Sequence, residues 1–506
     1  MLVVLLARSL SNLIIAQRKL LFLFAILTGP LLGAQEYNGF INSDFSGVLG
    51  VRAQPASIAD SPYKFDFNLI NANYYLTNNI GVSEISPEGL NVTRFTDLDP
   101  KFLHANVGLG GFSAMLSLPR NQGISLQFQV RSLSSGNDLS PQFISQVNRF
   151  TDQRFLNSTI TNQKGDFTTS VWQEIAISYA FVKKDDGYNR WKVGATLKLI
   201  NPLASVWATI EDIDYTINGA GLAQFTNLEA ELGYSSTLDD YQYFDGNQSF
   251  NQLPKGTGFK PGGDIGVVYE RVAYMEDPRS NRETRVKPDI TYEFRLGISI
   301  TDIGVMRFDQ GSAALAINGI LPNQGLIDFD DVFGNPDSFR DVRNSLETIL
   351  QVQDKTGAYT ISLPTSLHLN YDYNFWNNFY LNVAGRFDLT GLVPADYRLN
   401  YPSSITITPR YETGYSGFYL PFYRNLDGDS ELGAAIRHGA FTIGTHSLGS
   451  MLSKEKKSGG VFFSISLKQL KANSKKTYCF GSSRVGSGFA RSQRTPLYKR
   501  KKFLFF

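Results

Sequence analysis

Apolar and polar residues alternate without a break from Thr291 to Thr301. The apolar residues fall on every second position, and the positions between them include both Glu293 and Arg295. Successive side chains of a β-strand point to opposite faces. This stretch is therefore predicted to be a strand with one polar face and one apolar face, the latter made by Tyr292, Phe294, Leu296, Ile298 and Ile300.

The same alternation recurs along the chain in at least seven segments. Such repetition is typical of a transmembrane β-barrel, in which lipid-facing and lumen-facing residues must alternate. After the N-terminal region, no apolar run approaches the ~20 residues that a membrane-spanning helix needs. The pattern predicts an all-β fold, a transmembrane antiparallel β-barrel over residues 62–468, with apolar rows in 63–69, 124–130, 175–181, 191–199, 292–300, 359–371 and 379–389.

The number of strands depends on how two short sequences are interpreted. If Asn201-Pro202 and Asp302-Ile303-Gly304 are turns, the chain has about sixteen strands and long loops on both faces. If they are bends within long strands, the count is about fourteen and the long loops share one face. Bacterial barrels have an even strand number, short periplasmic turns and long extracellular loops. We therefore prefer fourteen strands, with extracellular loops at 79–104, 134–169, 218–260 and 319–356.

Two of these loops carry apolar residues at helical spacing. In 336–352 the stripe is Phe339, Val342, Leu346 and Ile349, and 140–155 has a similar stripe. Such stripes favour short helices that pack onto the loops beneath them, rather than a partner-binding role.

The polar faces of the predicted strands carry many charged residues. A lumen that contains both signs of charge is typical of ion pairs that hold an interior together rather than of acid–base catalysis. We expect the following charged residues to face the lumen: Arg131, Glu174, Lys192, Lys198, Glu293, Arg295, Asp372, Arg386 and Asp388.

The two ends of the chain lack strand periodicity. Residues 1–34 contain a basic region and a short apolar run, which indicates a signal peptide cleaved near Ala34, with an upstream start extension before Arg18. Residues 35–61 are rich in Gly, Asn, Ser and Asp, and are predicted to form a plug or a periplasmic lead-in. The tail 469–506 has ten basic residues and no acidic residue. It is either a disordered arm or the result of translation past a frameshift.

The net charge of +2 hides an uneven distribution. The two ends hold 13 of the 48 basic groups and no acidic group, so residues 35–468 keep 35 basic against 46 acidic groups. An acidic body of this kind does not indicate nucleic acid as a partner. The aromatic content of 13% suits the girdles that barrels place at membrane interfaces. The lone cysteine, Cys479, excludes an intramolecular disulfide.

No sequence motif for catalysis, a cofactor or a metal is evident. The four histidines, His104, His368, His438 and His446, are not spaced as zinc ligands. The stretch 425–429 weakly resembles a calcium loop, but a hairpin turn explains it better. We therefore expect a protein that is not an enzyme and has no cofactor.

Residues 47–69, G-V-L-G-V-R-A-Q-P-A-S-I-A-D-S-P-Y-K-F-D-F-N-L, resemble the start of a family of Bacteroidota outer-membrane barrels of unknown function. They are more distantly similar to the FadL/PorV group, whose Asn-Pro-Ala motif corresponds here to Gln54, Pro55 and Ala56, with Gln in place of Asn. Residues 260–270 and 292–304 look like the middle strands of that group. The resemblance covers about 40–468 and implies a fourteen-stranded barrel plugged at its N-terminus, with Gln54, Pro55 and Ala56 near the lumen mouth.

The resemblance implies two functions. FadL members move long-chain fatty acids and similar hydrophobic compounds across the outer membrane, whereas PorV members are scaffolds of secretion systems. The first hypothesis is a passive transporter of a small hydrophobic molecule, embedded in outer-membrane lipid. The second is a scaffold or shuttle that holds envelope or secretion proteins through its long loops. The charged lumen disfavours a continuous apolar tunnel, but we prefer transport because it is the commoner role for this shape.

Overall fold

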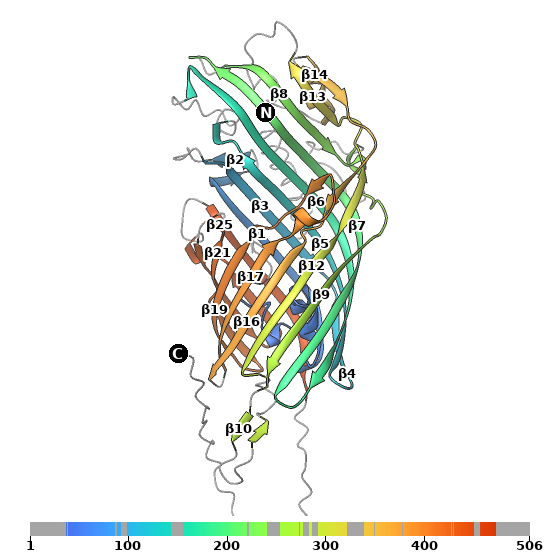
Figure 1. Cartoon of the computed structure of the whole chain (residues 1–506), viewed down its shortest axis with the longest axis vertical. Helices are drawn as coiled ribbons and strands as arrows, with labels where there is room; N and C mark the ends of the chain where they lie inside the picture. The colour runs from blue at the N-terminus through green and yellow to red at the C-terminus, as the bar shows by residue number, and fades with distance from the viewer. Residues whose placement is uncertain are drawn as a thin grey trace, which may run out of the picture.

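The computed structural model describes residues 37, 39–86, 89–92, 99–142, 155–219, 222–239, 254–272, 274–276, 283–285, 292–320, 339–348, 350–376, 378–426, 428, 430–449 and 456–471. The predicted signal peptide and residues 472–506 of the predicted tail lie outside them. The described chain forms a tall, tilted β-barrel, with short helical turns inside its lower part (Figure 1).

The strands form a closed antiparallel barrel of fourteen, so the fourteen-strand prediction is confirmed. Closure comes from the pairing of the first strand with the last, β1 with β25. The strands have these bounds: β1 (Tyr63–Ser86), β2 (Gly89–Val92), β3 (Lys101–Gly110), β4 (Ser113–Leu118), β5 (Gln122–Leu139), β6 (Ser158–Asp185), β7 (Asn189–Ile217), β8 (Ala223–Tyr234), β9 (Lys260–Arg271), β10 (Tyr274–Glu276), β11 (Glu283–Arg285), β12 (Phe294–Asp309), β13 (Leu315–Ile320), β14 (Leu350–Asp354), β15 (Ala358–Ser362), β16 (Ser366–Trp376), β17 (Phe379–Asp388), β18 (Tyr397–Arg398), β19 (Ser404–Glu412), β20 (Ser416–Tyr419), β21 (Phe422–Asn425), β22 (Ser430–Leu432), β23 (Ala434–His438), β24 (Phe441–Thr445) and β25 (Lys456–Leu470).

Several of these elements are consecutive parts of one barrel strand. The lower half of β7 pairs with β9, and its upper half pairs with β8. In the same way, β9 and β8 pair on their other edges with β12 and β13. The helical elements are η1 (Asp44–Arg52), η2 (Pro55–Ile58), η4 (Ser236–Leu238), α4 (Phe339–Glu347) and η6 (Thr390–Leu392).

The two ambiguous sequences are bends and not turns. Asn201-Pro202 lies within the continuous strand β7, where the pairing with β6 shifts between Val171 and Trp172. Asp302 adopts a left-handed conformation with φ 58°, and the pairing of β12 with β9 shifts between Ile300 and Ile303. A bulge bends a strand without ending it.

Three expectations about the loops and rows were wrong. The loop predicted at 218–260 contains β8, and the strands β1, β5 and β6 extend into the loops predicted at 79–104 and 134–169. The row predicted to point outward from Tyr359 to Tyr371 is divided: Tyr359, Ile361 and Leu363 are buried, while Leu369 and Tyr371 are exposed. Tyr292 was also predicted to face outward, but it is buried, because it precedes β12 and turns into the lumen.

An apolar band surrounds the lower part of the barrel. Its residues alternate with buried polar ones, and Leu197, Ile265 and Ile298 are 57%, 54% and 57% exposed. An exposed apolar surface of this extent indicates that lipid covers it, because a soluble protein rarely exposes such a surface to water. Exposed aromatic residues lie beside the lower turns, as expected for an interface girdle: Tyr188, Trp191, Phe375, Phe379, Tyr415 and Phe441.

The inside–outside pattern reverses in the upper part of the long strands. In β7, Ile210 and Ile213 are buried, whereas Glu211 between them is exposed. In β12, Met306 and Phe308 are buried and Arg307 is exposed. Exposed side chains are apolar in the lower strands, because lipid surrounds that part of the barrel. They are polar in the upper strands, because water surrounds that part. The upper interior is therefore a packed apolar core.

The short helix α4 belongs to this upper core. Its Val342 and Leu346 are buried against apolar residues of β7, β8 and β13, which include Ile213, Leu232 and Ile317. Val342 and Leu346 of the stripe in 336–352 thus pack onto the barrel, whereas Ile349 and most of 140–155 lie outside the described residues. Among the helices that the structure describes, none is long and apolar enough to cross a membrane.

The band predicts how charge is tolerated at two matched positions. Ile298→Lys places a cation in lipid, and we expect it to cost about 2–4 kcal/mol of folding free energy if the site is near the bilayer midplane. Glu211→Lys, above the band, should change the free energy by less than about 0.5 kcal/mol. Urea unfolding in lipid vesicles measures both. Equal costs at the two positions would show that the band does not contact lipid.

Candidate functional site: a lumen filled by the N-terminal segment

Residues 39–60, here called the N-terminal segment, lie inside the lower barrel (Figure 1). Phe40 packs edge-on against Tyr419 of β20, with ring centroids 5.6 Å apart, and Phe45 packs against Tyr63 of β1 at 6.1 Å. On the other side of the lumen, η2 contacts β5, β6, β7 and β9. Because the segment touches strands on opposite sides of the barrel, it occupies the lumen cross-section.

Local sequence sets the shape of the segment. The Ser43 hydroxyl accepts a hydrogen bond from the Phe45 amide and caps η1. The Gln54 side chain caps η2, which has Pro55 at its first position. Polar caps and an N-terminal proline both favour helix starts. Gly47 separates the two halves of η1 with φ 62°, a conformation that favours glycine.

A row of small residues in the wall seats η2. The row runs across five adjacent strands at directly paired positions: Gly123, Ala180, Gly194, Gly266 and Ser299. A Cβ atom at Gly194 would lie 2.5 Å from the Ala56 nitrogen, so only glycine leaves room for the segment there. We call this row the small-residue seat.

The sequence-predicted residues Gln54, Pro55 and Ala56 all lie against this seat. The Gln54 amide nitrogen donates to the carbonyl oxygens of Val267 and Ile298, at 3.3 and 3.2 Å. The Ser299 hydroxyl donates to the Ala53 carbonyl oxygen. Pro55 and Ala56 are buried. Polar contacts at the β9 and β12 end of the seat therefore hold η2 in position.

A first ion-pair cluster ties the segment to β12 and, through it, to β16 and β19. Arg295 pairs with Asp44 of the segment and, at 3.2 Å, with Asp372. Arg410 shares Asp372 and also pairs with Glu412 at 2.6 Å. All four wall side chains are buried, and the Tyr292 hydroxyl also donates to Asp372. We call Arg295, Asp372, Arg410 and Glu412, with Asp44, the lower ion-pair cluster.

A second cluster fills the lumen above the segment. Asp302 accepts from both Arg131 at 2.7 Å and Lys198 at 2.6 Å. Lys198 also pairs with Asp264 at 2.8 Å, and Arg131 with Glu174 at 3.2 Å. Two cations and three carboxylates thus form a buried layer, here called the upper ion-pair cluster. Such a layer is a poor path for an apolar molecule.

The other predicted lumen charges have separate surroundings. Lys192 pairs with Glu270 at 2.6 Å. The Asp388 carboxylate accepts from the Thr390 amide at 3.0 Å and caps a turn. Glu293 is half-buried and forms no ion pair with any described residue. Arg386 stacks over the Tyr401 ring at 4.4 Å.

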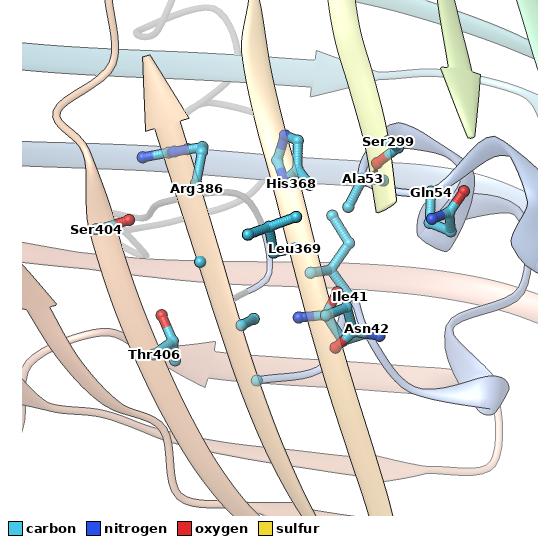
Figure 2. A pocket seen from close by; sticks show the side chains of 14 residues that line it. Ile41, Asn42, Ala53, Gln54, Ser299, His368, Leu369, Arg386, Ser404 and Thr406 are labelled. Carbon is cyan, nitrogen blue, oxygen red and sulfur yellow. Dashed lines mark hydrogen bonds between the residues drawn. The ribbon is translucent and has the colours of Figure 1, made fainter. Parts of the chain in front are cut away.

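A cavity of about 50 Å³ lies between the N-terminal segment and the wall formed by β12, β16, β17 and β19. Figure 2 shows Asn42 and Gln54 of the segment on one side, and His368, Arg386 and Ser404 of the wall around it. The space holds a few water molecules, since each needs roughly 10–15 Å³. A whole hydrophobic ligand does not fit while the segment stays in place.

Sequence reasoning missed several members of these clusters. Asp302 was interpreted only as part of a bend, and Asp264, Glu412 and Arg410 were not singled out. Arg410 and Glu412 are two residues apart on one strand face, which is a signal that could have found them. Among the described residues, no group of three or more His, Cys, Asp or Glu side chains could hold a metal ion. Two carboxylates of the calcium-like stretch, Asp427 and Asp429, lie outside the described residues.

A protein-family model described as a family of unknown function (DUF5723) matches residues 55–446. The chain belongs to this family. The match begins at Pro55 of η2 and ends at His446, so it includes the small-residue seat, the upper ion-pair cluster and the lower ion-pair cluster except Asp44. No functionally curated protein matches the chain.

Three solved structures illustrate its likeness to known barrels. The toluene transporter TbuX of Ralstonia pickettii has 10% identity and a TM-score of 0.39, and the match covers 84% of this chain and 94% of TbuX. The toluene transporter TodX of P. putida has 11% identity and a TM-score of 0.37, with 84% and 94% covered. A FadL homologue of Pseudomonas aeruginosa has 10% identity and a TM-score of 0.36, with 83% and 93% covered. Likeness at this level does not show which ligand this chain binds.

Proposed function

We propose that this protein is a passive transporter of a small hydrophobic molecule in the outer membrane of a Gram-negative cell, with the N-terminal segment as its gate. The observation that carries the proposal is the segment itself, which fills the lumen of a lipid-embedded barrel and contacts opposite walls. A barrel of this kind spans outer membranes, and its apolar band lies in their lipid.

The contacts of the segment suit a gate that moves. Its η2 lies on the small-residue seat, where glycines offer no side chains that interlock with it. Beside the seat, the cavity leaves the segment loosely packed against β16 and β17. A shift of the segment into this cavity would open space on its other side, along the small-residue seat. Movement of one packed element between two positions is a common form of gating.

A second function, a non-transporting scaffold or shuttle for envelope or secretion proteins, draws on a different observation. The upper ion-pair cluster and the apolar core around α4 obstruct the axis above the segment. A transporter with this interior must release its molecule through the side of the barrel. A scaffold needs no path through the barrel, because it transports no molecule.

Native purification from membranes, followed by mass spectrometry, separates the two functions. For a transporter we expect a copurified lipid-like or aromatic molecule and no stoichiometric protein. A Gly194→Leu variant, whose segment cannot seat, should retain less of that molecule than the parent protein. A stoichiometric envelope or secreted protein, found together with an empty lumen, would favour the scaffold and overturn the transport proposal.

A further inference from the structure

The cavity beside the N-terminal segment has an unbalanced charge. Arg386 is the one charged residue among the fourteen described residues that line it, and none of the fourteen is Asp or Glu. Figure 2 shows the Arg386 side chain on β17, with its nitrogen end directed away from His368 and toward the side on which Ser404 lies. The other lining side chains are neutral, so the cavity carries a positive charge.

Arg386 makes none of the usual guanidinium hydrogen bonds to the described residues. Within the described part of the chain, its Nε and Nη2 atoms are buried and have no acceptor. Its close neighbours are the Tyr401 ring at 4.4 Å and the imidazoles of His104 and His368, with which it interacts electrostatically. None of these groups is a carboxylate. Leaving two buried guanidinium nitrogens without an anion or an acceptor is costly, even though the residue as a whole is half-buried.

Other interior cations show what Arg386 is missing. Arg131, Arg295 and Arg410 each pair with two carboxylates, and Lys198 pairs with three. All of them face the same lumen, so the interior compensates its cations as a rule. Arg437, which is also buried, pairs with no carboxylate of the described residues, but it donates to the carbonyl oxygens of Thr413, Gly414 and Ser416. Arg386 has no such acceptor among the described residues, and it lies at a cavity, where an outside molecule can supply one.

We propose that this cavity binds a small oxyanion, with a carboxylate group as its chemical class, between Arg386 of β17 and the N-terminal segment. The planar guanidinium can donate two parallel hydrogen bonds to a carboxylate. The side chains of Ser404, Thr406 and Asn42 line the same space and offer further donors. The volume of about 50 Å³ suits a formate- or acetate-sized group in place of water.

The position of the site gives the anion a second effect. Asn42 and Gln54 belong to the segment, whereas Arg386 and Ser404 belong to the wall, so a bound anion touches both. A ligand that contacts two parts of a structure stabilises the state in which they are together. The anion therefore holds the segment in its seat. This regulation goes beyond the proposed transport and would operate in a scaffold as well.

Formate is the probe for the test. Saturation-transfer NMR on the full-length protein in detergent micelles should show formate binding to the parent protein and to Arg424→Met, whose arginine lies on the outer face of β21. Arg386→Met should weaken binding by about tenfold or more, because charge-assisted hydrogen bonds are lost. Arg386→Lys keeps the positive charge but cannot donate two parallel hydrogen bonds, so it should bind formate with intermediate affinity. Heat-modifiable gel migration verifies that each variant is folded.

A second measurement tests the effect on the segment. In a Cys479→Ser chain with Ser57→Cys in η2, formate should slow maleimide labelling severalfold, and Arg386→Met should remove this protection. Inorganic phosphate, which is larger and more highly charged, should protect less. The proposal is overturned if the parent protein does not bind formate, if Arg386→Met binds it as well as the parent does, or if labelling is insensitive to bound formate. Uptake of an uncharged probe does not depend on these results, so transport stands or falls separately.

Discussion

Asp372→Ala is expected to lower the free energy of unfolding by about 3 kcal/mol. Asp372 is buried and is shared by Arg295 and Arg410 in the lower ion-pair cluster. Removing one member of a buried pair leaves an uncompensated charge, which costs about 3–5 kcal/mol. We expect the lower end of that range, because Arg295 keeps Asp44 and Arg410 keeps Glu412. Urea unfolding in lipid vesicles, followed by tryptophan fluorescence, measures the change.

Asp309→Ala is the matched control for this prediction. Asp309 is the last residue of β12, is exposed, and forms no ion pair with another described residue. Its replacement should change the free energy by less than about 0.5 kcal/mol. If the two alanine variants unfold at the same urea concentration, the lower ion-pair cluster does not hold the barrel together.

Gly194→Leu is expected to unseat the N-terminal segment while leaving the barrel folded. The Cβ atom would lie 2.5 Å from backbone atoms of Pro55 and Ala56, which cannot move aside without moving η2. Overpacking of this kind costs about 1–3 kcal/mol, which corresponds to roughly a tenfold or larger shift in the seated population. Maleimide labelling of Ser57→Cys, in a Cys479→Ser chain, should accelerate by about that factor.

Gly111→Leu provides the comparison, because a Cβ atom at Gly111 meets nothing within 4 Å. Labelling at position 57 should be unchanged in this variant. Equal labelling rates in the parent, Gly111→Leu and Gly194→Leu chains would mean that the small-residue seat does not hold the segment.

The barrel could be predicted from sequence because its signal is local. Within 191–199, every second residue faces lipid and its neighbours face the lumen, so the alternation alone reveals the strand. The bends at Pro202 and Asp302 were distinguished from turns by the placement of long loops, which is a property of the whole chain. The upper strands were harder to predict. There, water replaces lipid outside, and the row from Tyr359 to Tyr371 changes face at Pro364.

The interior site could be predicted only in part, because its contacts join residues far apart in sequence. Arg131 was expected in the lumen, but nothing near it in sequence indicates Asp302 as its partner, 171 residues away. Arg386 was grouped with the other lumen charges, and only the fold shows that it lacks a carboxylate among the described residues. Gly194 and Gly266 fit a strand pattern as single residues. Only the pairing of the strands shows that they lie side by side and form part of the small-residue seat.

Tethering the N-terminal segment to the wall tests the proposed gate most directly. In a Cys479→Ser chain, cysteines at Ala53 and Ser299 replace two residues already joined by a hydrogen bond, and a short reducible linker can connect them. Cells that express each form are given an uncharged fluorescent hydrophobic probe. If the segment is the gate, uptake with the linker in place falls to the level of cells that lack the protein, and reduction restores it, while both single-cysteine chains behave as the parent. If the tethered protein takes up the probe as fast as the reduced protein, the segment is not the gate.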